Sequence, residues 1–285
     1  MTSKHEDIEV SYSVSNDFFK LWLDEEMHYT SGTYRTGKET LEEAQVLKAA
    51  LLSDWAEVTP ESYLLDIGCG WGSYLAYASK VRGVKRACGI TLSTEQLEWS
   101  KARNLPNVDF RLQDFNTWVP EEKFDAVVSI EMVDHMVSPA QARAGQAVDI
   151  YRNYFKRIHG WMKPGTCFGF QAILRDRVPR NRADLEDLRF TADVIFPGGL
   201  NPRIEELVIA SSRYFEIEEL RTQRMGYRHT TKEWHNRLVK NEALIRKQWG
   251  DRVYEDYDRY LGTCVRAFDA MWSSDVQFKL RWLPQ

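Results

Sequence analysis

The feature that most constrains this chain is a glycine-rich stretch at residues 63–73, Tyr-Leu-Leu-Asp-Ile-Gly-Cys-Gly-Trp-Gly-Ser. An apolar run ends in Asp66, and glycines follow at every second position, Gly68, Gly70 and Gly72. This order predicts a buried strand, a tight turn and a helix whose N-terminus faces a ligand. Because closely spaced glycines weaken any fold that has no use for them, the pattern disfavours a turn without a ligand.

The spacing of the glycines distinguishes between two kinds of nucleotide site. The dinucleotide fingerprint G-x-G-x-x-G needs a glycine at its sixth position, where this chain has Ser73. A carboxylate at Asp66 would repel a pyrophosphate, but it suits a ligand that carries an ammonium and a sulfonium group. S-adenosylmethionine (SAM) has both groups. The turn therefore predicts SAM as cofactor, with Asp66 and the three glycines at its site.

Beyond the turn, strand and helix signals alternate as far as residue 174. This alternation predicts a Rossmann-like α/β fold with a mostly parallel seven-stranded sheet and helices on both faces. Later helical stretches are interpreted as a substrate cap, because they follow strand ends that face the ligand. Besides the strand before Gly68, we expect strands at 86–92, 108–112, 124–130, 166–174, 215–220 and, antiparallel at the sheet edge, 276–282, with helices at about 40–53, 94–103, 139–161, 204–213 and 230–272.

These elements divide the chain into three expected parts. Residues 1–60 form an N-terminal helical segment that closes over the cofactor, and residues 61–174 form the SAM-binding α/β core. Residues 175–285 form the helical cap together with the last two strands of the sheet.

Charge and composition exclude several classes of protein. A formal net charge of −4 argues against a nucleic-acid partner. No apolar run approaches the length that spans a membrane, and the N-terminus lacks the apolar segment of a secretory signal, so we expect a cytoplasmic protein without stable membrane insertion. The four cysteines lack C-x-x-C spacing and predict no metal site. The sequence leaves open whether the protein forms a homo-oligomer.

Several segments together resemble the cyclopropane-fatty-acid synthase family of class I SAM-dependent methyltransferases. The resemblance implies an enzyme of that class, and plant-type alkaloid N-methyltransferases share the same pattern. The matching segments are Tyr12-Ser-Val-Ser-Asn-Asp-Phe-Phe19, Tyr29-Thr-Ser-Gly-Thr-Tyr34, Leu41-Glu-Glu-Ala-Gln45, Asp66-Ile-Gly-Cys-Gly-Trp-Gly72, Gly89-Ile-Thr-Leu-Ser93 with Gln96, Ser129-Ile-Glu-Met-Val-Asp-His135 and Phe196-Pro-Gly-Gly199.

The resemblance also implies which residues hold the cofactor. Each contact to its rings or ribose has packing at a strand end as the alternative interpretation. The implied contacts are Tyr29 and Thr30 closing over SAM, Gly68 and Gly70 beside its methionine part, Thr91, Leu92 and Gln96 at the ribose and adenosine, Asp114 and Phe115 at the adenine, and Ile130 beside the methyl group.

In lipid-modifying members the family pattern implies a bound bicarbonate that acts as the base. The four positions that would hold it are Ser31, Asp134, Gln171 and Tyr227 in this chain. The family has cysteine, glutamate and histidine at the first three positions, and only the tyrosine persists. Bicarbonate is therefore a doubtful cofactor here.

A second catalytic cluster, Glu131-x-x-Asp134-His135, follows the fourth strand. A histidine beside a carboxylate at a strand end can take a proton from a nucleophile. The alternative is a structural role for His135, as a helix cap or a contact to the SAM carboxylate.

Three functions fit these observations. The favoured one is methyl transfer to a carbon or nitrogen nucleophile of a small, partly apolar specialised metabolite, as in natural product biosynthesis. The second is cyclopropane synthesis on unsaturated acyl chains, for which residues 175–182 are the one candidate membrane-docking segment, although a solvated loop is the favoured interpretation of that segment. The third is a SAM-binding partner protein without catalysis.

Overall fold

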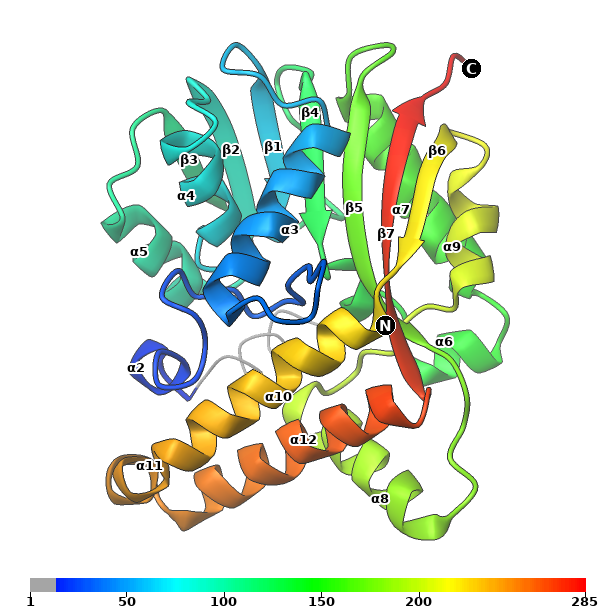
Figure 1. The fold of residues 1–285 in the computed structure, drawn as a ribbon. Helices are drawn as coiled ribbons and strands as arrows, with labels where there is room; N and C mark the ends of the chain where they lie inside the picture. The colour runs from blue at the N-terminus through cyan, green and yellow to red at the C-terminus, as the bar shows by residue number, and fades with distance from the viewer. Residues whose placement is uncertain (1–13) are drawn as a thin grey trace.

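The structure, a computed structural model, describes residues 14–285, so the expected match at 12–19 lies partly outside the described residues. Seven strands form one sheet in the order β3-β2-β1-β4-β5-β7-β6 (Figure 1). This architecture confirms the expected α/β fold of a class I methyltransferase. The strands are β1 (Tyr63–Ile67), β2 (Arg86–Thr91), β3 (Val108–Leu112), β4 (Ala126–Ile130), β5 (Cys167–Arg175), β6 (Phe215–Thr222) and β7 (Ser273–Trp282).

The first five strands are parallel. Their order changes direction at β1, because β2 and β3 lie on one side of it and β4 and β5 on the other. β1 pairs with β2 on one side and with β4 on the other. In sheets of this kind the ligand crevice lies beyond the carboxyl ends of the strands at such a reversal. The fold thus places the glycine turn after β1 at the expected binding point.

The expectation that the last strand lies at the sheet edge is wrong. β7 is antiparallel as expected, but it pairs with β5 along one side and with β6 along the other, so β6 is the edge strand. The physical reason is burial: Val276, Phe278 and Leu280 are fully buried, whereas most of β6 is exposed. A strand with apolar side chains of this kind belongs inside the sheet.

Helices cover both faces of the sheet (Figure 1). A Thr40 capping box starts α3, as the sequence predicts, and α3 packs on α4 and β5. On the other face α7 packs against α9. These elements are α2 (Asn16–Phe19), α3 (Leu41–Trp55), α4 (Ser73–Lys80), α5 (Thr94–Ala102), α6 (Pro139–Arg143), α7 (Ala147–Trp161) and α9 (Ile204–Ser211), with a 3₁₀ turn η1 (Val133–His135).

The cap consists of helices beyond the carboxyl ends of the parallel strands, at the opposite end of the molecule from the C-terminus (Figure 1). Its two long helices, α10 and α12, pack along each other, and α12 also contacts α8. The cap elements are α8 (Arg182–Phe190), the π-helical turn η2 (Thr191–Ile195), α10 (Arg224–Lys240), α11 (Glu242–Trp249) and α12 (Asp251–Asp269).

Two expected helices are interrupted by residues that end a helix. The stretch 139–161 divides into α6 and α7 at Gly145, which has a left-handed φ of 73°. The helical stretch 230–272 divides at Asn241 and Gly250 into three helices. Glycine stops a helix at such a point because it adopts the left-handed conformation without steric cost.

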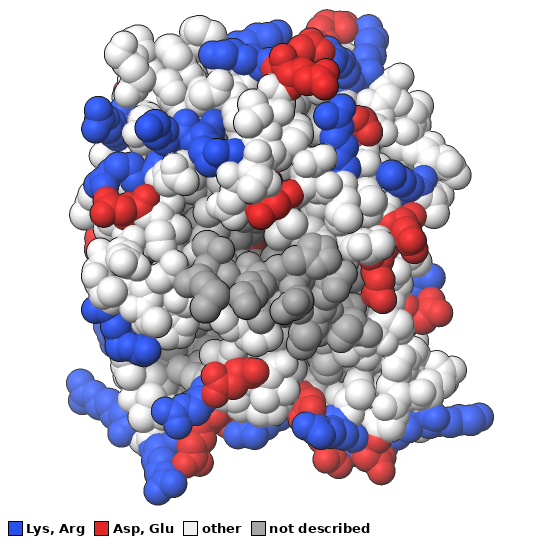
Figure 2. Space-filling model, turned by 180° about the vertical axis from the view of Figure 1, so that it is seen from behind, with Lys and Arg blue, Asp and Glu red and all other residues white. Residues whose placement is uncertain are grey.

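The described surface carries charges of both signs. On the face in Figure 2, lysine and arginine side chains are interspersed with acids near both ends of the molecule. Within residues 14–285, no helix is both long and apolar enough to cross a membrane.

Candidate active site

The glycine turn is built from three residues in left-handed conformations that serve different purposes. A Cβ on Gly72 would lie 2.8 Å from the ring of Phe110, so Gly72 permits packing of α4 on the sheet. A Cβ on Gly68 would lie 2.8 Å from Met132. At Gly70 the nearest atom would be Gln96 Nε2 at 3.9 Å, so its backbone borders open space. Gly70 is therefore the point where a ligand can approach the main chain.

A cavity of about 530 Å³ opens beside this turn. Most of the predicted site residues line it, although they come from segments throughout the chain. Three predicted residues do not line it: Gly72, which packs beside Phe110, and Ser31 and Gln171, which contact Glu131. The predicted residues that line the cavity are Tyr29, Thr30, Asp66, Gly68, Gly70, Thr91, Leu92, Gln96, Asp114, Phe115, Ile130, Glu131, Asp134, His135 and Tyr227.

At the cofactor end, polar side chains are held ready for a ligand. Thr91 Oγ1 donates to Gln96 Oε1 at 3.0 Å, which directs the Gln96 amide nitrogen away from Thr91. Burial raises the pKa of the Asp66 carboxyl to about 7, opposed by the charge of Lys48. A cationic ligand beside Asp66 would favour its ionised form. Both features fit a ligand with a ribose and an ammonium group.

The loop that carries Tyr29 and Thr30 is fixed from behind by α3. Gln45 Nε2 donates to the backbone oxygen of Thr30 at 2.8 Å, and Lys48 Nζ donates to Thr30 Oγ1 at 2.6 Å. Lys48 is fully buried, and burial lowers its pKa to about 8. Thr30 Oγ1 accepts from Lys48, so its hydroxyl proton is available to another acceptor. Because Thr30 lines the cavity, a ligand there can be that acceptor.

Glu131 is the centre of the second half of the site. It follows β4 with a left-handed φ of 57°, which is costly for a residue with a side chain and typical of functional sites. Its Oε1 accepts from the Ser31 backbone N–H at 2.9 Å and from Gln171 Nε2 at 2.7 Å, and its Oε2 accepts from the Tyr227 hydroxyl at 2.8 Å. Burial raises the pKa of Glu131, opposed chiefly by the Ser31 N–H and by Lys48.

These contacts decide whether the bicarbonate implied by the family pattern fits. Three of the four positions that would hold it direct donors at Glu131 instead. These donors are the Ser31 backbone N–H, Gln171 Nε2 and the Tyr227 hydroxyl, while the Ser31 side chain donates to the Gly32 carbonyl. The carboxylate of Glu131 thus takes the donors that a bound anion would need, and a second anion would lie beside a buried acid. The residues of this chain do not fit bicarbonate.

Asp134 and His135 lie beyond Glu131 in the turn η1. Asp134 Oδ2 accepts from the Ile173 N–H at 3.1 Å, while Oδ1 has no partner among the described residues. Burial, together with the nearby Glu131, raises the pKa of Asp134 well above its usual range. Burial lowers the pKa of His135 to about 4. At neutral pH His135 is therefore a neutral imidazole, and burial favours the protonated form of Asp134.

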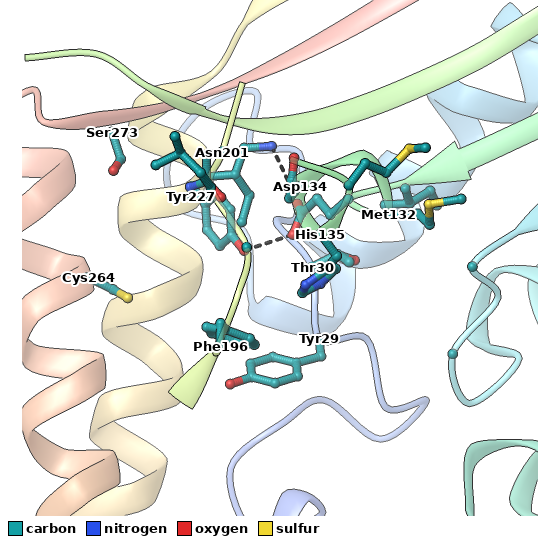
Figure 3. A pocket seen from close by; sticks show the side chains of 18 of the residues that line it. Tyr29, Thr30, Met132, Asp134, His135, Phe196, Asn201, Tyr227, Cys264 and Ser273 are labelled. Atoms are coloured by element: carbon teal, nitrogen blue, oxygen red, sulfur yellow. Dashed lines mark hydrogen bonds between the residues drawn. The ribbon is translucent and has the colours of Figure 1, made fainter. Parts of the chain in front are cut away.

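Aromatic side chains close the cap side of the site (Figure 3). The ring of Tyr29 lies 6.1 Å from that of Phe196, and its hydroxyl donates to Tyr260 at 3.2 Å. Tyr227 projects from α10 toward Glu131, and its ring stacks on Phe268 at 4.7 Å. These contacts join the N-terminal loop, the 196–199 segment and the cap helices around one cavity.

Sequence reasoning missed the residues that support Glu131 from behind. They are buried, and β7 supplies Asp275 and Gln277. The available signal was the alternation of polar and apolar residues along β7. For a strand at the sheet edge, such alternation indicates that the polar face is solvated. Within the sheet, the same polar face is buried. The missed residues are Thr33, Lys48, Gln223, Asp275 and Gln277.

One further cluster in the described part of the chain could in principle hold a cation: Glu57, Cys167 and Glu218. Lys279 and Arg281 already form ion pairs with both glutamates. The cluster is accordingly neutralised by the protein itself, and we assign it no metal.

Together, the sheet order, the glycine turn and the capped cavity define a class I SAM-dependent methyltransferase. Comparison with known proteins gives the branch: the chain belongs to the mycolic acid cyclopropane synthetase family, whose model matches residues 1–278. It is thus an enzyme with SAM as cofactor.

Individual relatives match along nearly their whole length. The S-adenosylmethionine-dependent methyltransferase UmaA of Mycobacterium tuberculosis is 30% identical over 290 residues, covering 97% of each chain. Cyclopropane mycolic acid synthase 2 of Mycobacterium bovis is 30% identical, covering 94% of this chain and 92% of its own. Among solved structures, the cyclopropane synthase MmaA2 of M. tuberculosis superposes with a TM-score of 0.89 at 27% identity, covering 99% of both chains.

Proposed function

We propose that the enzyme methylates an electron-rich carbon, a carbon–carbon double bond, in an apolar acceptor, and that Glu131 is the base. SAM supplies an electrophilic methyl group when bound. The π electrons of the acceptor form the new C–CH₃ bond while the S–CH₃ bond breaks and its electron pair stays on sulfur. The acceptor is then a carbocation, and one proton passes from it to Glu131. The observation that carries this proposal is the buried carboxylate of Glu131.

The hydrogen bonds of Glu131 leave room for that proton. A carboxylate has about four lone-pair sites on its two oxygens. Ser31 and Gln171 take both sites on Oε1, and Tyr227 takes one on Oε2. The remaining site is on Oε2, and Glu131 lines the cavity. A fixed anion in this position also stabilises a developing cation, because it needs no reorganisation during the reaction.

The cavity supports an acceptor of limited size. Its volume of about 530 Å³ is in the ordinary range for one ligand site, and it must hold the cofactor as well. The acceptor is therefore a small molecule or a short segment of a longer chain. Apolar side chains dominate the wall supplied by the cap, among them Leu188, Phe196, Ala267 and Phe268, and Ile173 of β5 adds to it.

Charges on the cap side favour carbon over nitrogen as the nucleophile. The cavity wall at the end of β5 and beyond includes Arg175, Arg177 and Arg203, with Asp176 as its one acid, and Arg175 is paired with Glu206. Most amines are cationic at neutral pH, and Arg177 and Arg203 would disfavour their approach along this wall. An alkene carries no charge before the transfer, so it enters such a site at no electrostatic cost. The names of the relatives, cyclopropane synthases among them, support the same choice.

The acceptor class is tested with SAM carrying a trideuterated methyl group. The enzyme is incubated with a cell lipid extract, with short alkenes and with small amines, and products are identified by mass spectrometry. Cyclopropanation removes one deuteron from the transferred methyl group, whereas a methyl branch retains all of them. A labelled small alkene supports an acceptor of specialised metabolism, and a labelled acyl chain supports a lipid. Label confined to amines would overturn the proposal.

The role of Glu131 is tested by the isosteric change Glu131→Gln. We expect turnover to fall by about a hundredfold or more, as for other general bases, with SAM affinity within about threefold of wild type. Glu219→Gln, at an exposed position of β6, is the matched control and should be unchanged. Full turnover by Glu131→Gln would exclude Glu131 as the base.

A further inference from the structure

A chain of buried polar side chains leads from Glu131 into β7 and ends at a second carboxylate. Gln277 Nε2 donates to Gln171 Oε1 at 2.7 Å and to Thr33 Oγ1 at 3.1 Å. Thr33 Oγ1 donates to Gln223 Oε1 at 3.2 Å, and Gln223 Nε2 donates to Asp275 Oδ2 at 2.6 Å. Gln277 is fully buried and does not line the cavity.

The directions of these hydrogen bonds follow from the carboxyl groups at the two ends of the chain, Glu131 and Asp275. An ionised Glu131 only accepts, so Gln171 must offer it a nitrogen, and at the other end Gln223 offers its nitrogen to Asp275 Oδ2. The oxygens of both amides then point inward and need donors. One nitrogen, Nε2 of Gln277, serves both arms, to Gln171 directly and to Gln223 through the Thr33 hydroxyl. Turning the Gln277 amide over would present an oxygen to both arms at once.

We propose that Gln277 is a positioning residue for the methyl-transfer reaction: by donating to Gln171 Oε1 it fixes the amide of Gln171 with its N–H toward Glu131. The distant Asp275 anchors the other arm of the chain. This inference rests on the proposed role of Glu131 as base. Gln277 touches neither cofactor nor acceptor, and its effect reaches the reacting atoms through Gln171 alone.

The consequence is that the basicity of Glu131 depends on Gln277. Glu131 is faced by the Ser31 N–H, by Gln171 and by Tyr227, and it feels the charges of Lys48, Asp134 and Asp275. If Gln277 no longer holds Gln171, Glu131 loses one of its donors. Loss of a donor to the ionised form raises a carboxyl pKa. The acid limb of the turnover profile would then move to higher pH.

The test is Gln277→Met, which keeps the side chain's length and removes the donor. We expect kcat to fall by about tenfold, the acid limb of the kcat profile to move to higher pH, and SAM affinity to stay within about twofold. Thr33→Val removes the hydroxyl at nearly constant shape and should move the limb in the same direction by less. It keeps the inference testable if Gln277→Met does not fold.

A double-mutant cycle separates positioning from a general structural effect. In a Gln171→Met background, Gln277→Met should change neither kcat nor the acid limb any further. Additive losses would overturn the inference, as would an unshifted acid limb in both Gln277→Met and Thr33→Val. Should Glu131→Gln itself be fully active, the proposed function fails first. If Glu131→Gln is inactive while Gln277→Met matches wild type, only the inference about Gln277 fails.

Discussion

The ammonium group of Lys48 lies 2.6 Å from the hydroxyl of Thr30, and both belong to the wall behind the cofactor end of the cavity. Lys48 is surrounded by acids: its ammonium group interacts with Glu131, Asp24 and Asp275 as well as with Asp66. A buried lysine is retained at a cost, because burial penalises its charged form. Its position indicates that it keeps the Thr30 loop in place and offsets this group of acids.

Replacing Lys48 by methionine should therefore weaken SAM binding. The substitution preserves the stem of the side chain and removes the hydrogen bond to Thr30. We expect the dissociation constant for SAM, measured by titration calorimetry, to rise by about tenfold, since a charge-assisted hydrogen bond contributes about 1.5–3 kcal/mol. Thr30→Val should produce a similar loss. A Lys48→Met enzyme with wild-type SAM affinity would remove Lys48 from the cofactor site.

Alanine substitutions in the glycine turn should separate ligand contact from packing. Gly70→Ala places a Cβ at the edge of the cavity, so SAM affinity should fall strongly while the melting temperature changes little beyond the cost of a left-handed alanine. Gly68→Ala places a Cβ 2.8 Å from Met132 and should lower the melting temperature more. Differential scanning calorimetry with and without SAM measures both effects. Unchanged SAM affinity in Gly70→Ala would contradict the assignment of the turn.

Asp66 should give SAM binding a pH dependence of known sign. Burial raises its pKa from 3.8 to about 7, so in the free protein the carboxylate becomes populated only as the pH approaches neutrality. A ligand with an ammonium group binds the ionised form, and affinity should rise several-fold between about pH 6 and pH 7.5, below the pH where an α-amino group loses its proton. Calorimetric titrations across this range measure it. In Asp66→Asn the affinity should be lower and flat with pH.

His135 should affect turnover without setting its pH profile. Burial holds the pKa of His135 near 4, whereas the pKa of Glu131 is raised, so the base becomes active as the pH rises through the pKa of Glu131. His135→Ala should reduce kcat by about tenfold, more than it reduces SAM affinity, with the acid limb unmoved. Asp134→Ala should likewise cost turnover more than affinity. Equal losses of turnover and affinity in these variants would make both residues structural.

The sequence predicts the core of this fold because its local signals agree with its tertiary structure. The glycine turn, the Thr40 capping box and the apolar run of β4 each have one favourable structure, and they alternate in the order of a parallel sheet. The cofactor end of the site follows from the same signals, because its residues lie at strand ends. Asp66, Thr91 and Ile130 line the cavity for that reason.

The acceptor end is different, because it depends on contacts between residues far apart in the chain. Local pattern gives no hint that Gln171 and Tyr227 converge on Glu131 rather than on a bound anion. Nor does it show that the last strand enters the sheet between β5 and β6, which turns the polar face of Asp275 and Gln277 inward. Strand order is a global property, so these residues became candidates only once their neighbours were known.

The placement of β7 has a consequence for how this enzyme matures. During synthesis β7 is made after the other six strands, yet it has to enter between two of them. Until it does, β5 and β6 have no partner along that side, and Gln171 lacks the neighbour that orients it. During synthesis a domain generally folds as a unit. The sheet that carries the cofactor turn and the orientation of Gln171 toward Glu131 are therefore both completed by the last strand to be made, which delays chemistry until folding is complete.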